Sequence, residues 1–417
     1  MNLSEELSWR GFVNQTTYKD AAALDGDPIT FYWGVDPSAD SMQVGNFACA
    51  MMVRHFIAHG HKAILLVGGA TGMIGDPDGK SQERELQSLD TIAANKAGIT
   101  AQYQRIFDGM DFTIVDNYDW FKDMNYLTFL RDVGKHVPLR TMLGRDFVSS
   151  RLGDDGAGIS YAEFSYSLIQ GYDFLHLHKE FGATLQVCGA DQWGNSIAGV
   201  DLIRRVTGNE AHIWSAPLVI NKANGIKFGK TEVGAIWLDP KKTSPTQFYQ
   251  FWINVDDAGV GDYLKIYTLL TKAEITAVLE QQTANPSARQ AQKLLAAHVT
   301  TLVHGTDAAQ TAADVTDILT GVKPLADIDA TSLATLKAEI ATYQAPAGAS
   351  VIDCLVASGL AASLSDARRL LSGNAVSVNG VKIAQDTLDE DLYSNGRLLL
   401  RRGKAFKDSA LIELKNS

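Results

Sequence analysis

The first 225 residues alternate short apolar runs with helical patterns, and this alternation constrains the fold more than any other feature of the chain. FYWGV at 31–35, KAILLVGGATG at 62–72 and TLQVCGADQWGN at 184–195 each begin as an apolar strand and run into turn residues. Helical patterns follow the first and the third of these strands. Strands that alternate with helices predict an α/β fold built on a parallel sheet.

The helix expected after the first strand has Val44, Phe47 and Met51 on one face. The polar turn before it, 36–41, ends in Ser41, whose hydroxyl group suits the N-cap position. The sequence therefore predicts that this helix begins just after Ser41, close to the end of the first strand.

The rest of the chain changes character twice. From Pro245 to His304 the pattern is helical, and Ser287 is the expected N-cap of the long last helix. Residues 321–349 are rich in Ala, Pro, Gly and Asp, which indicates a linker with one embedded helix. Two short helical patterns then precede a hairpin that turns at Asn379-Gly380. The predicted domains are 1–225, 226–320 and 350–417, with the linker 321–349 between the last two.

Charge and cysteine content limit the function classes. The chain has 37 lysines and arginines against 48 aspartates and glutamates, a formal net charge of −11, so it is no general binder of polyanions. Cys49, Cys188 and Cys354 lie far apart and favour neither a disulfide framework nor a zinc site. The sequence shows neither a signal peptide nor a membrane span. We therefore expect a soluble cytoplasmic protein without a protein-bound structural metal.

Three polar segments carry candidate chemistry, although each also reads as an ordinary turn. GGATGMIGDPDGK at 68–80 supplies glycines that allow a ligand to approach the backbone closely. KFGKT at 227–231 places Lys227 and Lys230 in a polar loop, where they suit the charge that develops on a pyrophosphate. Asp191 and Gln192 follow a strand and suit a ribose hydroxyl and a carboxylate, or else cap the next helix.

A fourth candidate lies in the helical pattern YAEFSYSLIQGYDFL. Tyr166, Gln170 and Asp173 are spaced by four and three residues, which places them on one helix face. Burying these groups without a polar partner is costly, and a substrate with an amine and a hydroxyl group would be such a partner. The alternative is a solvated helix face.

Taken together, these segments resemble the bacterial tyrosyl-tRNA synthetases, which are class I aminoacyl-tRNA synthetases. The resemblance covers nearly the whole chain. It implies a class I Rossmann-like α/β catalytic domain, an α-helical domain on the anticodon side, and a small α+β RNA-binding domain of the ribosomal-protein type. The matching segments include YWGVDPSADSMQVGN, GGATGMIGDPDGK, EFSYSLIQGYDF, GADQWGN, KFGKT and TSPTQFYQFWIN.

One signature departs from the family. Where the family has His-x-Gly-His, this chain reads Gln43-Val44-Gly45-Asn46. Gln43 and Asn46 keep NH₂ donors of comparable reach, but the charge of an imidazolium is lost. The sequence predicts an active enzyme with an altered phosphate contact, and the alternative is a catalytically weakened or silent RNA-binding relative. A tryptophan-activating enzyme would share the architecture, but Tyr32 with Asp173 favours a phenol.

The resemblance implies that tyrosine and ATP give tyrosyl-adenylate and pyrophosphate, and that tyrosine is then transferred to the 3′ end of tRNA(Tyr). Mg²⁺ would accompany ATP, and the enzyme would be a homodimer. The implied catalytic residues are Gln43, Asn46, Lys227, Lys230 and Thr231. The implied tyrosine contacts are Tyr32, Asp76, Tyr166, Gln170, Asp173 and Gln192. The implied ATP contacts are Gly34, Asp36, Ser38, Gly45, Cys49, Gly189, Asp191 and Lys230.

The acidic net charge leaves a local basic patch as the route to tRNA. Residues 351–417 hold 9 basic and 8 acidic residues, and most of the basic ones are clustered. Their helix–helix–hairpin pattern resembles a ribosomal-protein-type RNA-binding fold, which would place these cations against phosphates. The candidate RNA-binding residues are Arg368, Arg369, Arg401, Arg402 and Lys404.

Overall fold

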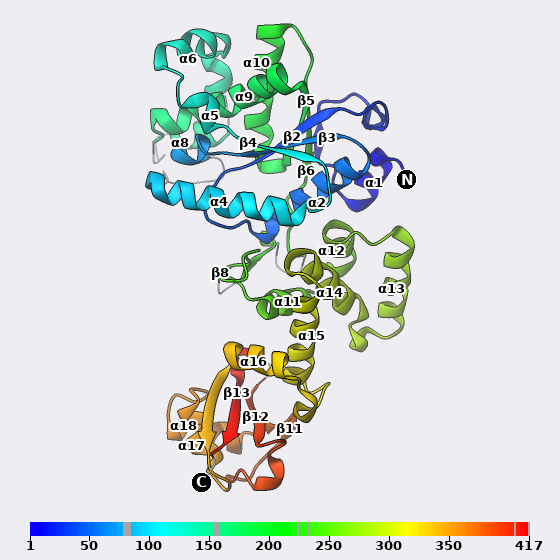
Figure 1. Ribbon diagram of the computed structural model, residues 1–417, viewed down its shortest axis with the longest axis vertical. Coiled ribbons are helices and arrows are strands. Elements are labelled where there is room, and N and C mark those ends of the chain that lie inside the picture. Colours follow the sequence, from blue (N-terminus) through cyan, green and yellow to red (C-terminus); the bar gives the residue numbers. More distant parts are fainter. Residues whose placement is uncertain are drawn as a thin grey trace. The chain divides into compact units, whose positions relative to one another are not determined.

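The computed structural model describes residues 1–77, 85–144, 146–152, 158–222, 225–231, 234–403 and 406–415. The chain forms two compact units, which Figure 1 shows coloured along the sequence. The first contains Met1–Thr243 and Val255–Leu295, and the second contains Ser244–Asn254 and Ala296–Ser417. Within the described ranges, no helix has both the length and the apolar character needed to cross a membrane.

A six-stranded sheet forms the centre of the first unit, in the order β1-β6-β5-β2-β3-β4. Strands β2 to β6 pair in parallel, and the short β1 joins β6 in the antiparallel direction. The parallel α/β sheet predicted from the alternating pattern is therefore confirmed. The strands are β1 (Gln15–Thr16), β2 (Thr30–Val35), β3 (Lys62–Val67), β4 (Phe112–Asp116), β5 (Ala183–Gly189) and β6 (His212–Ala216).

The strand order reverses between β2 and β5. The chain passes from β2 to β3 and β4 on one side, and it then continues at β5 on the other side of β2. Open parallel sheets bind ligands at the carboxyl ends of the strands where the order reverses. The topology therefore directs attention to the residues that follow β2 and β5.

The helices of the first unit include members on both faces of this sheet (Figure 1). They are α1 (Leu3–Arg10), α2 (Val44–Ala58), α3 (Thr71–Ile74), α4 (Leu89–Ile106), α5 (Tyr118–Phe121), α6 (Tyr126–Asp132), α7 (Leu139–Leu143), α8 (Asp146–Leu152), α9 (Tyr161–Phe181), α10 (Trp193–Thr207), α12 (Val260–Tyr267) and α13 (Lys272–Ala284). Two strands of two residues each, β7 (Lys230–Thr231) and β8 (Gly234–Ala235), pair in the antiparallel direction and belong to the same unit.

The two faces of β2 have different partners because successive side chains of a strand point in opposite directions. Trp33 packs against Tyr103 of α4, with ring centroids 5.4 Å apart. Tyr32 points to the other face and packs against Phe174 of α9, with centroids 5.1 Å apart. This alternation brings Tyr32 beside α9, the helix that carries the predicted polar face.

The helix after β2 begins later than predicted. Its first residue is Val44 and its N-cap is Gln43, so the expectation that Ser41 caps it is wrong. The Ser41 hydroxyl donates to the carbonyl of Met42 at 2.9 Å and accepts from the Nε2 of Gln102 at 2.8 Å. Ser41 is 4% exposed, so these buried hydrogen bonds occupy the group that would have capped the helix.

The second unit contains a five-stranded sheet in the order β11-β10-β12-β13-β9, in which only β9 and β13 pair in parallel. Its strands are β9 (Ala341–Ala345), β10 (Val376–Val378), β11 (Val381–Lys382), β12 (Arg397–Arg402) and β13 (Ser409–Leu414). Its helices are α11 (Pro245–Ile253), α15 (Thr306–Thr320), α16 (Ala330–Glu339), α17 (Val351–Ala357) and α18 (Leu364–Ser372). Helix α14 (Gln290–His304) begins in the first unit and ends in the second, and Ser287, its expected cap, lies in the preceding 3₁₀ turn.

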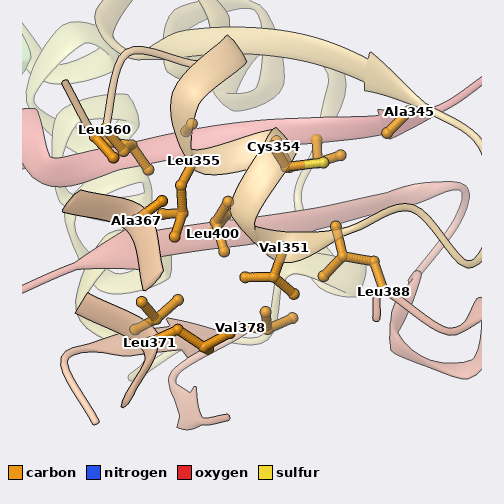
Figure 2. Close-up of a cluster of buried hydrophobic side chains, with 14 of the residues drawn as sticks. Ala345, Val351, Cys354, Leu355, Leu360, Ala367, Leu371, Val378, Leu388 and Leu400 are labelled. Carbon is orange, nitrogen blue, oxygen red and sulfur yellow. The ribbon is translucent and has the colours of Figure 1, made fainter. Parts of the chain in front are cut away.

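Helices cover both faces of this second sheet as well. On one face Leu398 and Leu400 of β12 join a core with residues of α17 and α18, which Figure 2 shows. On the other face Leu399 packs with Val315 and Ile318 of α15 and with residues of α16. The β12 strand is therefore buried on both sides by alternate residues.

Two local predictions in this unit have different outcomes. The hairpin turn at Asn379-Gly380 is confirmed, since both residues have positive φ, 49° and 83°, and Val378 pairs with Val381. The segment 321–349 contains the expected embedded helix, α16, but it also contains β9, which was not predicted. Four of the five β9 residues are exposed, so their sequence has no apolar strand pattern, and pairing with β13 defines the strand.

Candidate active site

The face shared by β2 and α9 holds a buried carboxyl group with an unusual partner set. Asp173 is 2% exposed, and its two oxygens accept hydrogen bonds from Asn117 Nδ2 at 3.0 Å and Trp120 Nε1 at 2.9 Å. Burial raises the pKa of Asp173 well above its usual range, and the two donors oppose that shift. A carboxylate oxygen has two lone pairs, so each Asp173 oxygen is able to accept one further hydrogen bond.

The hydroxyl group of Tyr32 lies on the same face. It is fully buried, and among the described residues it has no hydrogen-bond partner. Burial raises its pKa, and the nearby charge of Asp173 adds to this shift. Buried polar groups are nearly always hydrogen-bonded, so an unpartnered hydroxyl beside a carboxyl group fits a ligand that brings its own hydroxyl.

Asn117 and Trp120 are site residues that sequence reasoning missed. Asn117 directly follows β4, and Trp120 lies in the short helix α5. A polar residue just after a strand was a usable signal, because the carboxyl ends of the parallel strands share one edge of the sheet. No strand was predicted at 112–116, so the sequence offered no reason to place Asn117 at the end of a strand.

A second carboxylate, Asp36, lies just after β2 and is held by two hydroxyl groups. Tyr166 of α9 donates to one oxygen at 2.6 Å, and Thr71 donates to the other at 2.6 Å. Thr71 in turn accepts from Asn117 Nδ2 at 3.0 Å. The same asparagine therefore connects the surroundings of Asp173 with those of Asp36.

The glycines after β3 make room for this network. A Cβ atom at Gly68 would lie 2.1 Å from Asp36 Oδ1 and 2.3 Å from Thr71 Oγ1. A Cβ atom at Gly69 would lie 2.3 Å from Asp116 Oδ1. These glycines, which were predicted to let a ligand approach the backbone or to form a turn, leave room for the carboxylates of Asp36 and Asp116 in the structure. Residues 78–80 of the same predicted segment lie outside the described residues.

A third carboxylate, Asp76, contacts the amides at the start of α10. Gln192 Nε2 donates to Asp76 Oδ2 at 2.7 Å. Asn195 Nδ2 lies 3.3 Å from both Asp76 Oδ1 and Gln192 Oε1. Gln170 is half-buried on α9, one turn after Tyr166 and on the same helix face.

The start of α2 packs against residues 227–229 of the KFGKT segment, and this segment (227–231) is called the lysine loop. Phe228 is buried and stacks on Tyr263, with ring centroids 4.2 Å apart, which anchors the loop. Gly229 has φ 86°, and a Cβ atom there would lie 3.1 Å from Val44 Cβ. The Val44 N–H donates to the carbonyl of Ile236 at 3.1 Å. These contacts place 227–229 beside the first turn of α2.

Polar groups surround the contact between the first turn of α2 and residues 227–229. Asn46 is exposed, and its Oδ1 accepts from the N–H of Gln43 at 3.1 Å, so its NH₂ group is the end left for other acceptors. A Cβ atom at Gly45 would meet nothing within 4 Å. Lys227 Nζ lies 3.5 Å from Asp191 Oδ2. The side chains of Lys230 and Thr231 lie outside the described part of the structure, although their backbone forms β7.

The residues after β5 lie close to α2. A Cβ atom at Gly189 would lie 2.7 Å from Asp191 Oδ1 and 3.7 Å from Cys49 Sγ. Burial raises the pKa of the Cys49 thiol, and the charge of Asp191 adds to this, so the thiol is protonated at neutral pH and is no activated nucleophile. Gly34 and Ser38, at and after the end of β2, are both exposed.

Known proteins match this chain along nearly its whole length. Residues 24–320 match the family model described as tRNA synthetases class I (W and Y), and residues 332–407 match the Tyrosine–tRNA ligase SYY-like C-terminal domain. The tyrosine–tRNA ligase of Corynebacterium glutamicum is 45% identical over 414 residues, which cover 97% of this chain and 98% of that protein. The tyrosine–tRNA ligase of Escherichia coli is 43% identical over 414 residues, with 97% of each chain covered.

The chain belongs to the tyrosine–tRNA ligase family. A solved structure, a C-terminally truncated mitochondrial tyrosyl-tRNA synthetase of Aspergillus nidulans, has a TM-score of 0.68 and 31% identity, and it covers 75% of this chain and 92% of its own. The class I α/β architecture and the family membership predicted from the motifs are therefore confirmed.

In this member of the tyrosine–tRNA ligase family, the predicted RNA-binding residues lie on different faces of the C-terminal sheet. Arg368 and Arg369 are exposed on α18. The hydrogen bond from Arg369 lowers the pKa of Asp366, and the nearby charge of Arg402 adds to this, so Arg402 lies close to α18. Arg401 is on the opposite face, where its Nη1 donates to the carbonyl of Leu319 at the end of α15, at 2.6 Å. Lys404 lies outside the described residues.

Proposed function

We propose that this chain activates L-tyrosine with ATP, forming tyrosyl-adenylate and pyrophosphate, and then transfers tyrosine to the 3′ end of tRNA(Tyr). Its family membership makes it an ATP-dependent aminoacyl-tRNA ligase. The observation that carries the choice of tyrosine is the buried hydroxyl of Tyr32, which lies on the same face as Asp173 and has no hydrogen-bond partner in the described part of the chain. The phenol group of a substrate tyrosine supplies both a donor for the carboxyl group of Asp173 and an acceptor for the hydroxyl group of Tyr32.

The remaining tyrosine contacts follow from charge. Asp76 and Tyr166 present oxygens to the α-ammonium, and Gln170 lies on the same face of α9 as Tyr166. Gln192 carries the amide that meets the α-carboxylate. Asp36 follows β2 and Gln192 follows β5, at the carboxyl ends where the strand order reverses. Tyr166 and Asp76 are hydrogen-bonded to these two residues.

The chemistry needs no general base, because the tyrosine carboxylate is already ionised at neutral pH. Catalysis depends instead on positioning and on stabilising the charge of the leaving pyrophosphate. Lys227, Lys230 and Thr231 of the loop supply this stabilisation, together with the amides of Gln43 and Asn46. The first turn of α2 adds partial positive charge. Mg²⁺, held by the ATP phosphates, would supply further neutralisation.

The ATP site lies between the ends of β2 and β5 and the start of α2. We assign Gly34, Asp36, Ser38, Gly189 and Asp191 to the ribose and the α-phosphate of the adenylate. Gly45 leaves the open space above α2 that a flat base needs, Cys49 lies beside Gly189 and Asp191, and Lys230 would reach the phosphates.

A catalytically silent RNA-binding relative is the second candidate, and the replacement of both signature histidines by Gln43 and Asn46 is the observation that favours it. The experiment that separates the two is tyrosine-dependent exchange of labelled pyrophosphate into ATP by the purified protein. Exchange with tyrosine, and far less with phenylalanine or tryptophan, is expected. No exchange with any aromatic amino acid would support the silent relative.

The C-terminal domain is proposed to bind tRNA through Arg368, Arg369, Arg402 and Lys404. Replacing Arg368 and Arg369 together with alanine should weaken tRNA binding and lower the slope of log K against log salt by up to about 2, one for each lost phosphate contact. Tyrosine-dependent pyrophosphate exchange should stay unchanged. Arg401→Ala is the matched control, because Arg401 caps α15. Arg401→Ala should lower the melting temperature and leave the salt slope unchanged. A change in slope as large as that of the Arg368/Arg369 double variant would contradict the separation of these arginines into tRNA-binding and structural groups.

A homodimer is also proposed, and exposed apolar side chains on α6 to α9 support it. Leu127 is 75% exposed, Tyr126 59% and Tyr161 61%, and the hydroxyl groups of the two tyrosines are 3.2 Å apart. Apolar surface of this kind marks an interaction site. Leu127→Glu should shift the mass measured by light scattering from dimer to monomer without lowering the melting temperature. A dimer that persists would place the interface elsewhere.

The predicted domain division into 1–225, 226–320, the linker 321–349 and 350–417 remains a proposal, as does a cytoplasmic location. Partial proteolysis with mass spectrometry of the fragments tests the division. Because β9 pairs with β13, we expect cleavage before residue 341 and protection of 341–345.

A further inference from the structure

Asn195 is buried at the centre of the contacts around Asp76 and Gln192. It is the last residue of the GADQWGN segment, in which the sequence assigned a role only to Gly189, Asp191 and Gln192. It lies in the first turn of α10 and is 1% exposed. Its Nδ2 is 3.3 Å from Asp76 Oδ1 and 3.3 Å from Gln192 Oε1, while Gln192 Nε2 donates to Asp76 Oδ2 at 2.7 Å. The three side chains therefore form a closed triangle of hydrogen bonds.

The chemistry of the three groups fixes the orientation of the Gln192 amide. A carboxylate only accepts hydrogen bonds, so Gln192 must present its NH₂ group to Asp76. The amide oxygen then faces the other way, toward the NH₂ group of Asn195. Without that donor, only the contact with Asp76 orients the amide, and a ligand that takes over Asp76 would leave the amide free to turn its oxygen toward the ligand.

We propose that Asn195 is a positioning residue that fixes the amide of Gln192, and through it the recognition of the α-carboxylate of tyrosine. This inference rests on the proposed assignment of Asp76 to the α-ammonium and of Gln192 to the α-carboxylate. An ammonium group is charged and carries three donors, so it competes successfully with the neutral Gln192 NH₂ group for Asp76. The α-carboxylate is attached to the same carbon atom and therefore arrives beside the NH₂ group that the ammonium displaces.

Asn195 acts as the pivot of this exchange. While Gln192 Nε2 changes its acceptor from Asp76 to the substrate carboxylate, Oε1 keeps its contact with Asn195. A flipped amide would instead present its oxygen to a carboxylate, which is repulsive. The loss of Asn195 should therefore affect ligands that carry a carboxylate and should largely spare ligands that carry only an ammonium.

Three ligands separate these effects: L-tyrosine, tyramine, which lacks the carboxylate, and 3-(4-hydroxyphenyl)propionate, which lacks the ammonium. Their dissociation constants are measured by calorimetry with the full-length protein. Asn195→Ala should raise the constants for tyrosine and for the propionate about tenfold, and the constant for tyramine less than about threefold. Asn195→Ser keeps a shorter donor and should fall between wild type and Asn195→Ala. It also serves as the test variant if the alanine protein does not fold.

Ser196 provides a matched control on the same turn of α10. It is as buried as Asn195, but its hydroxyl group donates to the backbone carbonyl of Gln192 at 2.8 Å and not to the side-chain amide of Gln192. Ser196→Ala should therefore change the three constants equally or not at all. A purely structural role of Asn195 would give the same uniform pattern for Asn195→Ala, and that result would overturn the proposal.

Gln192→Ala distinguishes the failure of this inference from the failure of the site assignment. It should raise the dissociation constants of the same two ligands that carry a carboxylate, L-tyrosine and the propionate. If it does so and a folded Asn195 variant leaves all three constants unchanged, the role of Asn195 is refuted while Gln192 keeps its assignment. If Gln192→Ala changes none of the constants, the assignment of Gln192 fails, and the inference fails with it.

Discussion

Replacement of Asp173 with alanine is expected to lower the preference for tyrosine over phenylalanine by about 100-fold or more, while the dissociation constant for ATP stays within about threefold. A hydrogen bond to a charged group contributes about 1.5–3 kcal/mol, and the substrate hydroxyl would be left buried without its partner at further cost. Tyrosyl-tRNA synthetases in general discriminate against phenylalanine by about 10⁵ for this reason, a figure known for such enzymes and not calculated from this structure. The measurement is kcat/KM for pyrophosphate exchange with each amino acid.

Tyr32→Phe is the companion variant for this prediction. The Tyr32 hydroxyl has no protein partner among the described residues, so its removal should cost no stability, and the preference for tyrosine should fall by only about tenfold, as for a neutral hydrogen bond. Asp173→Ala should lower the melting temperature, because Asn117 and Trp120 lose their acceptor. An equal loss of tyrosine and ATP binding in Asp173→Ala would contradict the assignment.

The second large effect is expected from Lys230→Ala, which should slow adenylate formation by about 100- to 1000-fold. Removing one donor that stabilises developing negative charge costs about 2.7–4 kcal/mol in comparable sites. Tyrosine binding should remain near normal, because the tyrosine contacts come from β2, α9, the residues after α3 and the start of α10. Single-turnover formation of tyrosyl-adenylate measures the rate, and equilibrium dialysis measures tyrosine binding.

A surface lysine near the loop provides the control for charge alone. Lys222 is exposed and pairs with Asp262, so Lys222→Ala should change neither measurement. Lys227→Ala should have an intermediate effect on the rate, because Lys227 already contacts Asp191. If Lys230→Ala abolished tyrosine binding instead of slowing the reaction, the loop would not act on the phosphates as proposed.

Much of the fold could be predicted from the sequence because its signals are local. The apolar runs of β2, β3 and β5 and the Asn379-Gly380 turn each carry their own pattern, and the structure confirms them. Strand β9 has no such pattern, since four of its five residues are exposed. Its existence depends on pairing with β13, about 70 residues away in the chain.

The candidate site divides in the same way. The spacing of Tyr166, Gln170 and Asp173 on α9 was readable because a helix repeats every 3.6 residues. The roles of Trp120 and Asn195 were not readable, and that of Asn117 was readable only once β4 was known, because their importance comes from contacts with residues distant in sequence. Asn117, for example, contacts Asp173 and Thr71, which are 56 and 46 residues away.

The sequence by itself determined the family, the α/β class and the chemical types of the side chains that meet tyrosine and ATP, because these depend on ordered motifs and short-range periodicity. Only the tertiary structure decided which of these groups share a face. Arg401 and Arg402 are adjacent in the sequence, yet Arg401 caps α15 and Arg402 lies near α18 on the opposite side of the sheet. The physical reason is the alternation of side chains along β12, which separates neighbours in sequence by the thickness of a sheet and brings distant residues together on each of its faces.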